Sequence, residues 1–123
     1  MKKIDVFTHI WPEAYFKALI GIVGEMHAIT ARSGRVPMMT NLDRRFEVMD
    51  MFGDDYCQIL SLAAPPLEAI CTPDQALELS RIGTDSMAEL CAKYPRRFPG
   101  FIGTAPLSNS AACVDECRRA IEE

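Results

Sequence analysis

The chain has 123 residues, 49% of them hydrophobic, which is the length of one domain with enough apolar side chains for a core. Thirteen basic and seventeen acidic residues are scattered along it and leave a net charge of −4. Because no basic stripe is present, neither nucleic acid nor an anionic membrane is expected as a partner. No apolar stretch reaches the roughly 18 residues of a membrane span, and the first residues are not expected to form a signal peptide. Five cysteines without zinc-type Cys-x-x-Cys pairs indicate reduced thiols, so we expect a cytoplasmic protein that acts on small molecules.

A strand-like apolar run opens the chain and delivers a histidine near its end. Period-two alternation places side chains on two faces: Ile4, Val6 and Thr8 on one, and Asp5, Phe7 and His9 on the other. Apolar residues on both faces are typical of a strand that is buried on both sides, in a parallel sheet covered by helices.

Helices and strands alternate along the rest of the chain. We expect helices over residues 13–24, from 40 or 41 to about 52, over about 73–94, and from 108–110 to the end. Strands are expected over 56–62 and 98–104. The last helix is expected to turn four side chains inward, namely Cys113, Cys117, Ala120 and Ile121. Residues 25–40 have no clear period and are interpreted as a mobile loop over the mouth of a site. This alternation predicts right-handed parallel βαβ units.

Five landmarks in order carry a family resemblance over nearly the whole chain. They are His9-Ile10-Trp11-Pro12, Arg45-Phe46-Glu47-Val48-Met49-Asp50, Leu60-Ser61, Tyr94-Pro95-Arg96-Arg97-Phe98 and Ala105-Pro106-Leu107. Together they resemble the aminocarboxymuconate-semialdehyde decarboxylase-like branch of the amidohydrolase superfamily. The resemblance implies a (β/α)8 TIM barrel, of which residues 1–123 would form the first three βα units. It also implies a metal-dependent enzyme, with zinc as the expected ion, that decarboxylates or hydrolyses a small unsaturated or aromatic carboxylic acid.

The chain ends in a helix that carries two acidic residues, Glu122 and Glu123, at its negative pole and lacks a glycine cap. A (β/α)8 barrel needs eight units and about 250 residues. We therefore expect the chain to be the first part of a larger protein and to be inactive alone. Its open sheet edges predict a homo-oligomer or association with the missing part.

Active sites in parallel α/β folds lie at the carboxyl ends of strands, which here selects His9 with Trp11, residues 61–65, and residues 104–106. The resemblance makes His9 a metal ligand, because the family's first strand ends in Asp-x-His-x-His. Phe7 occupies the position of the first of these histidines. Further ligands would come from strands beyond residue 123. Asp5 could accept a hydrogen bond from the His9 ring, or it could be a structural carboxylate.

Two residues are candidates for substrate binding. Arg35 lies near the position where the resemblance implies an arginine that grips a substrate carboxylate, with Arg32 as a competitor and a solvated loop arginine as the alternative. Trp11 could form an apolar wall of the site or could belong to the core. His27 could be a base or a surface histidine.

Two rival functions stay open. Because Phe7 removes a ligand, the protein could be a catalytically silent barrel that binds a metabolite or a protein partner. The chain could also be a self-contained three-stranded module that uses a cysteine thiolate, although no basic neighbour in the sequence would lower the pKa of a thiol.

Overall fold

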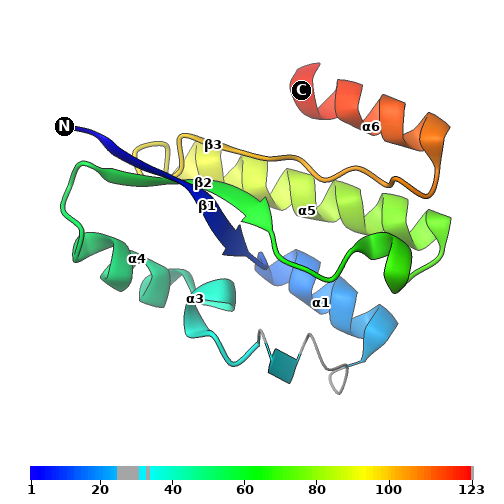
Figure 1. Ribbon diagram of the computed structural model, residues 1–123, viewed down its shortest axis with the longest axis horizontal. Helices are drawn as coiled ribbons and strands as arrows, with labels where there is room; N and C mark the ends of the chain where they lie inside the picture. The colour runs from blue at the N-terminus through cyan, green and yellow to red at the C-terminus, as the bar shows by residue number, and fades with distance from the viewer. Residues whose placement is uncertain (25–30, 33, 123) are drawn as a thin grey trace.

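The computed structural model describes residues 1–24, 31–32 and 34–122. In chain order its elements are β1 (Lys3–Ile10), α1 (Glu13–Val23), α3 (Pro37–Thr40), α4 (Leu42–Asp50), β2 (Tyr56–Leu62), η1 (Leu67–Ala69), α5 (Pro73–Lys93), β3 (Gly100–Phe101) and α6 (Ser110–Glu122). The three strands pair in parallel in the order β1-β2-β3, as Figure 1 shows. This arrangement confirms the expected βαβ units and is consistent with part of a TIM barrel, while the closed barrel stays a prediction.

The helix starts follow the capping residues of the sequence. Asn41 Oδ1 accepts a hydrogen bond from Arg44 N at 3.0 Å and begins α4. Thr72 and Gln75 form a reciprocal capping box at the start of α5. Asn109 Oδ1 accepts from Ala112 N at 3.1 Å and so caps α6. Within the described residues, no helix is both long and apolar enough to cross a membrane.

The strands differ from expectation at two places. A bulge interrupts β1, because Asp5 pairs with Gln58 whereas Thr8 pairs with Leu60, which leaves one extra residue in β1. The alternation of side chains therefore reverses, and the prediction that Asp5 shares a face with His9 is wrong. The third strand is also shorter than the expected 98–104. Phe98 N still donates to Tyr94 O in the turn after α5, and Pro99 has no N–H to donate, so β3 begins only at Gly100.

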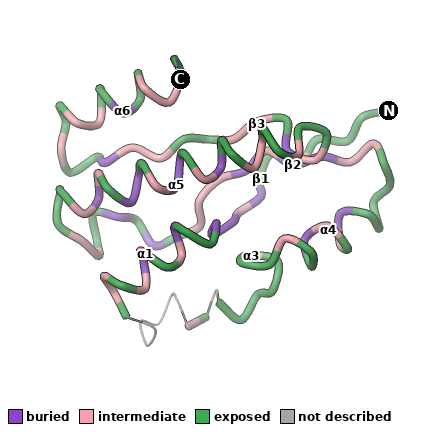
Figure 2. Tube along the Cα trace, turned by 180° about the vertical axis from the view of Figure 1, so that it is seen from behind, coloured by how far each residue is buried: buried purple, intermediate pink, exposed green. Residues whose placement is uncertain are grey.

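One face of the sheet, which we call the helix face, packs against α4 and α5. Its core consists of Ile10, Met49, Leu60, Met87 and Phe98, all nearly inaccessible to solvent. A second cluster joins α1 and η1 to the first half of α5 and contains Trp11, Tyr15, Leu19, Leu67, Ala76 and Leu79. Figure 2 shows the buried segments gathered along α5, α1 and the strands. Burial on this side supplies the main hydrophobic stabilisation of the fold.

The opposite face, which we call the site face, carries Ile4, Phe7, His9, Ile59, Ser61 and Ile102. Three of its apolar residues are exposed: Ile4 by 52%, Phe7 by 81% and Ile102 by 56%. The expectation that the first strand is buried on both sides is therefore wrong for this chain. The physical reason is that α4 and α5 both pack on the helix face, and no described element covers the site face.

The last helix packs through charge rather than through apolar residues. Glu116 is 1% exposed, and its carboxylate accepts hydrogen bonds from Arg81 of α5 and from Arg119. Ile121 is 85% exposed and Cys117 is exposed, so the expectation that these two residues turn inward is wrong. Figures 1 and 2 show α5 lying between α1 and α6.

Candidate functional site

His9 lies near the carboxyl end of β1, beside Ser61 of β2, with which it is paired in the sheet. Its Nδ1 lies 2.9 Å from Ser61 Oγ, and the same hydroxyl donates to Thr8 O at 2.7 Å. Thr8 Oγ1 in turn donates to Ile59 O at 2.6 Å. The imidazole is thus attached to a hydrogen-bonded frame that spans the two strands. The strand-end rule had selected both His9 and Ser61 from the sequence.

Arg45 supports the end of β1 from the helix face. Its guanidinium donates to His9 O, to Gln58 Oε1 at 2.7 Å and to Met38 O at 3.1 Å, and so ties β1, β2 and α3 together. Burial lowers the pKa of Arg45, while the nearby Tyr56 and Asp5 act in the opposite direction.

Sequence reasoning treated Arg45 only as a landmark and missed this function. A signal was present, because Arg45 lies three residues after Leu42 and four before Met49, which puts it on the inner face of the helix.

Phe7 and Asp5 point to different sides of β1. The Phe7 ring meets the His9 ring edge-on, with centroids 4.9 Å apart and an angle of 70° between the planes. Phe7 is therefore the neighbour of His9 on the site face. Asp5 accepts hydrogen bonds from Tyr56 Oη at 2.8 Å and from Phe7 N at 3.1 Å. Its contacts fit the structural alternative, and it does not orient the imidazole.

Trp11 is fully buried in the α1–α5 cluster. Its ring stacks on Phe16 with centroids 5.1 Å apart, and its indole N–H donates to Ala63 O at 3.4 Å. A cavity of about 710 Å³ between α1, α4 and α5 has Trp11 among its lining residues but not His9. These contacts correspond to the core alternative, and a wall facing a substrate stays a prediction.

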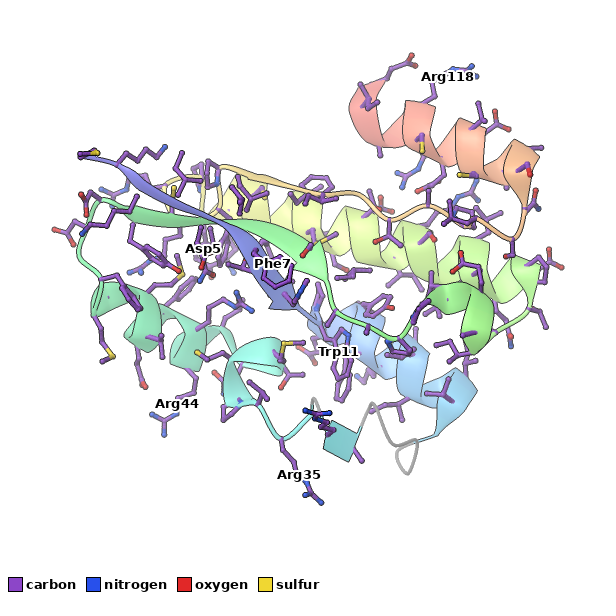
Figure 3. The ribbon with its side chains drawn as sticks, in the orientation of Figure 1. Asp5, Phe7, Trp11, Arg35, Arg44 and Arg118 are labelled. Carbon is purple, nitrogen blue, oxygen red and sulfur yellow. The ribbon has the colours of Figure 1, made fainter. Side chains whose placement is uncertain are left out.

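Arg35 is exposed and lies in a turn, where its N–H donates to Arg32 O at 3.3 Å. Figure 3 shows its side chain pointing away from the sheet, at the edge of the molecule. The structure therefore does not bring Arg35 to His9. Its grip on a carboxylate stays a prediction. His27 lies outside the described residues.

A metal centre requires several donor atoms that converge on one point. Zinc needs three or four protein ligands. Within residues 1–24, 31–32 and 34–122, no three His, Cys, Asp or Glu side chains lie together so that they could hold a metal ion. His9 offers one nitrogen, Phe7 offers no donor, and Asp5 faces the other side. The described residues therefore do not form a metal site by themselves, and His9 fits only as one ligand of a larger set.

Comparison with known proteins gives one consistent relationship, although no family model matches the chain. Over 81 residues, or 66% of the chain, it is 40% identical to gamma-resorcylate decarboxylase of Rhodococcus jostii (strain RHA1). It is 38% and 37% identical to the proteins of the same name from Rhizobium sp. (strain MTP-10005) and Rhizobium radiobacter. The matched part spans 24% of the length of each relative. The similarity supports the resemblance to the amidohydrolase superfamily and does not favour the aminocarboxymuconate-semialdehyde branch.

Proposed function

We propose that this chain forms the first three βα units of a (β/α)8 metal-dependent decarboxylase that acts on a small aromatic carboxylic acid. The observation that carries the proposal is the 40% identity, over 81 residues, to a protein named gamma-resorcylate decarboxylase. The geometry agrees, because parallel strands present His9 and Ser61 at their carboxyl ends, where this architecture builds its active sites.

In this proposal His9 is one ligand of a divalent metal, with zinc as the expected ion. The remaining ligands would come from strands outside this chain, because the described residues supply only one. The names of the relatives favour a carboxy-lyase over a hydrolase. Arg35 is proposed to bind the substrate carboxylate and Trp11 to wall the site, which for Arg35 requires the loop to fold toward His9.

The site face also supports an association proposal. Three exposed apolar side chains lie on or beside the outer strands, namely Ile4 and Phe7 on β1 and Ile102 directly after β3. Within the described residues no further strand pairs with the outer edges of β1 and β3. We propose that this face is covered by the rest of the barrel, and that the isolated chain forms homo-oligomers. A cytoplasmic location completes the proposal.

One observation favours a second function. Phe7 lies directly against His9, in the position where the resemblance implies another imidazole. A barrel without that ligand could bind a metabolite or a protein partner without catalysis.

The test uses the protein that contains this chain, purified without chelators. We expect near-stoichiometric divalent metal and release of CO₂ from gamma-resorcylate, and we expect His9→Ala to lower both by at least tenfold. Arg44→Ala, which removes an exposed ion pair with Glu47, serves as the control and should change neither. Protein without metal and without activity would support the silent alternative. Full metal occupancy in His9→Ala would show that His9 is not a ligand.

A further inference from the structure

We propose that Ser61 is a positioning residue for His9: its hydroxyl holds the neutral imidazole in the tautomer that carries hydrogen on Nδ1 and leaves the Nε2 lone pair available. The relevance of this tautomer to metal binding rests on the proposed function. The tautomer itself follows from three residues of the sheet.

The direction of the two hydrogen bonds is decided by Thr8 O. A carbonyl oxygen can only accept, so the contact of 2.7 Å between Ser61 Oγ and Thr8 O uses the single proton of the hydroxyl. Ser61 Oγ then has only lone pairs to offer to Nδ1 of His9, which lies 2.9 Å away. Nδ1 must therefore carry the hydrogen and donate it.

The pairing of β1 with β2 holds this arrangement in place. His9 and Ser61 are paired neighbours on adjacent strands, and Thr8 precedes His9 on the same strand. Thr8 is 6% exposed, and its own hydroxyl donates to Ile59 O, while Arg45 donates to His9 O. The three hydrogen-bonded atoms, His9 Nδ1, Ser61 Oγ and Thr8 O, are therefore held in place by both strands. The serine does not need to reorient.

The other ring nitrogen has no hydrogen-bond partner within the part of the chain that the structure describes. The Phe7 ring meets the imidazole edge-on, with ring centroids 4.9 Å apart, and contributes no donor or acceptor atom. A histidine whose Nδ1–H makes a hydrogen bond has its lone pair on Nε2, so Nε2 is the nitrogen that can bind a metal ion. Ser61 thus determines which atom of His9 is offered.

Nitrogen NMR of the imidazole tests the proposal without metal or substrate. The chain is labelled with ¹⁵N in a His27→Gln background, which leaves His9 as the single histidine, and the two ring nitrogens are recorded at a pH where the ring is neutral. We expect the Nδ1–H tautomer to dominate. Ser61→Ala should lower the ratio of the Nδ1–H to the Nε2–H form by roughly fivefold, the effect of one lost hydrogen bond. Ser61→Thr keeps the hydroxyl and should restore the ratio.

Ser80→Ala is the matched control, because Ser80 is a buried serine whose Oγ has no hydrogen-bond partner among the described residues. It should leave both nitrogen shifts unchanged. A dominant Nε2–H tautomer in the chain with the native Ser61 would overturn the proposal, even if Ser61→Ala failed to fold. An unchanged ratio in folded Ser61→Ala would overturn it as well. Because the measurement needs no metal, these outcomes are distinct from a failure of the proposed decarboxylase function.

Discussion

The helix face and the site face belong to the same three strands and have similar residue types, but their surroundings differ. Leu60 on the helix face is completely buried, whereas Phe7 on the site face is 81% exposed. The helix face also holds the buried hydrogen bonds of Arg45, and the site face holds the imidazole of His9. The packed core and the proposed chemistry therefore lie on opposite sides of one sheet, so substitutions on the two sides should have separable effects.

The largest effect is expected from Arg45 on the helix face. Arg45→Met keeps much of the volume but removes the donors to His9 O, Gln58 Oε1 and Met38 O. Buried acceptors without partners are costly, so we expect a loss of about 3 kcal/mol in the free energy of unfolding. Urea denaturation at fixed protein concentration measures it.

The adjacent Arg44 provides the control for that substitution. Arg44 is 63% exposed, and its ion pair with Glu47 contributes little, so Arg44→Met should change stability by less than about 0.5 kcal/mol. Equal losses in the two variants would mean that the bridge made by Arg45 does not stabilise the helix face.

A second break of the helix face uses Gly83, where α5 approaches β2 closely. A Cβ at this position would lie 2.4 Å from Leu62 Cδ1 and 3.1 Å from Tyr15 Cδ2. Overpacking should outweigh the better helix propensity of alanine, and we expect Gly83→Ala to lower the unfolding free energy by about 2 kcal/mol. Thermal unfolding followed by circular dichroism provides the measurement.

Gly21 in α1 tests whether space is the cause. Nothing lies within 4 Å of a Cβ built there, so Gly21→Ala should stabilise the chain by up to about 1 kcal/mol. A stabilising Gly83→Ala would show that the Leu62 and Tyr15 side chains can shift to accommodate the added methyl group.

The sequence predicted the elements better than their surroundings. The helices expected from residue 40 or 41 and from about residue 73 begin within a residue or two of those positions, because caps such as Asn41 and Thr72 depend only on nearby atoms. The bulge in β1 depends on pairing with β2, so period-two alternation misplaced Asp5 relative to His9. The inward face of α6 was misjudged for a similar reason. The buried residue of α6 is Glu116, and its burial is favourable only because Arg81, on another helix, donates a hydrogen bond to it. For the site, the strand-end rule selected His9 and Ser61, but their hydrogen-bonded frame depends on register.

On the site face, Phe7→His should change function with little effect on stability. Phe7 is exposed, so we expect a change within about 0.5 kcal/mol in unfolding free energy. A second imidazole beside His9 should tighten Co²⁺ binding to the chain at least tenfold, which corresponds to about 1.4 kcal/mol. Isothermal titration measures the affinity.

Phe52→His adds the same group at another exposed phenylalanine, which stacks on Tyr56 rather than on His9, and should give no comparable gain. Equal affinities of Phe7→His and the unsubstituted chain would mean that the residue-7 position does not present a ligand next to His9.

The smallest effect is expected at α6, where charge replaces apolar packing. Hydrogen bonds from Arg119 and Arg81 hold the pKa of Glu116 below its ordinary value of 4.5, with burial opposing them. Since the folded pKa lies below the unfolded one, the stabilisation is complete above about pH 4.5 and is lost as the pH falls through the folded value.

Glu116→Gln should therefore cost about 1 kcal/mol at neutral pH, the difference between charged and neutral hydrogen bonds, and should flatten the stability profile in acid. Asp115→Asn removes a carboxylate from the exposed side of the same helix, where its ion pair with Arg118 spans 3.7 Å, and should leave the acid limb unchanged. Urea denaturation between pH 3 and pH 7 distinguishes the two variants, and an acid limb that survives in Glu116→Gln would mean that α6 is held by something other than this carboxylate.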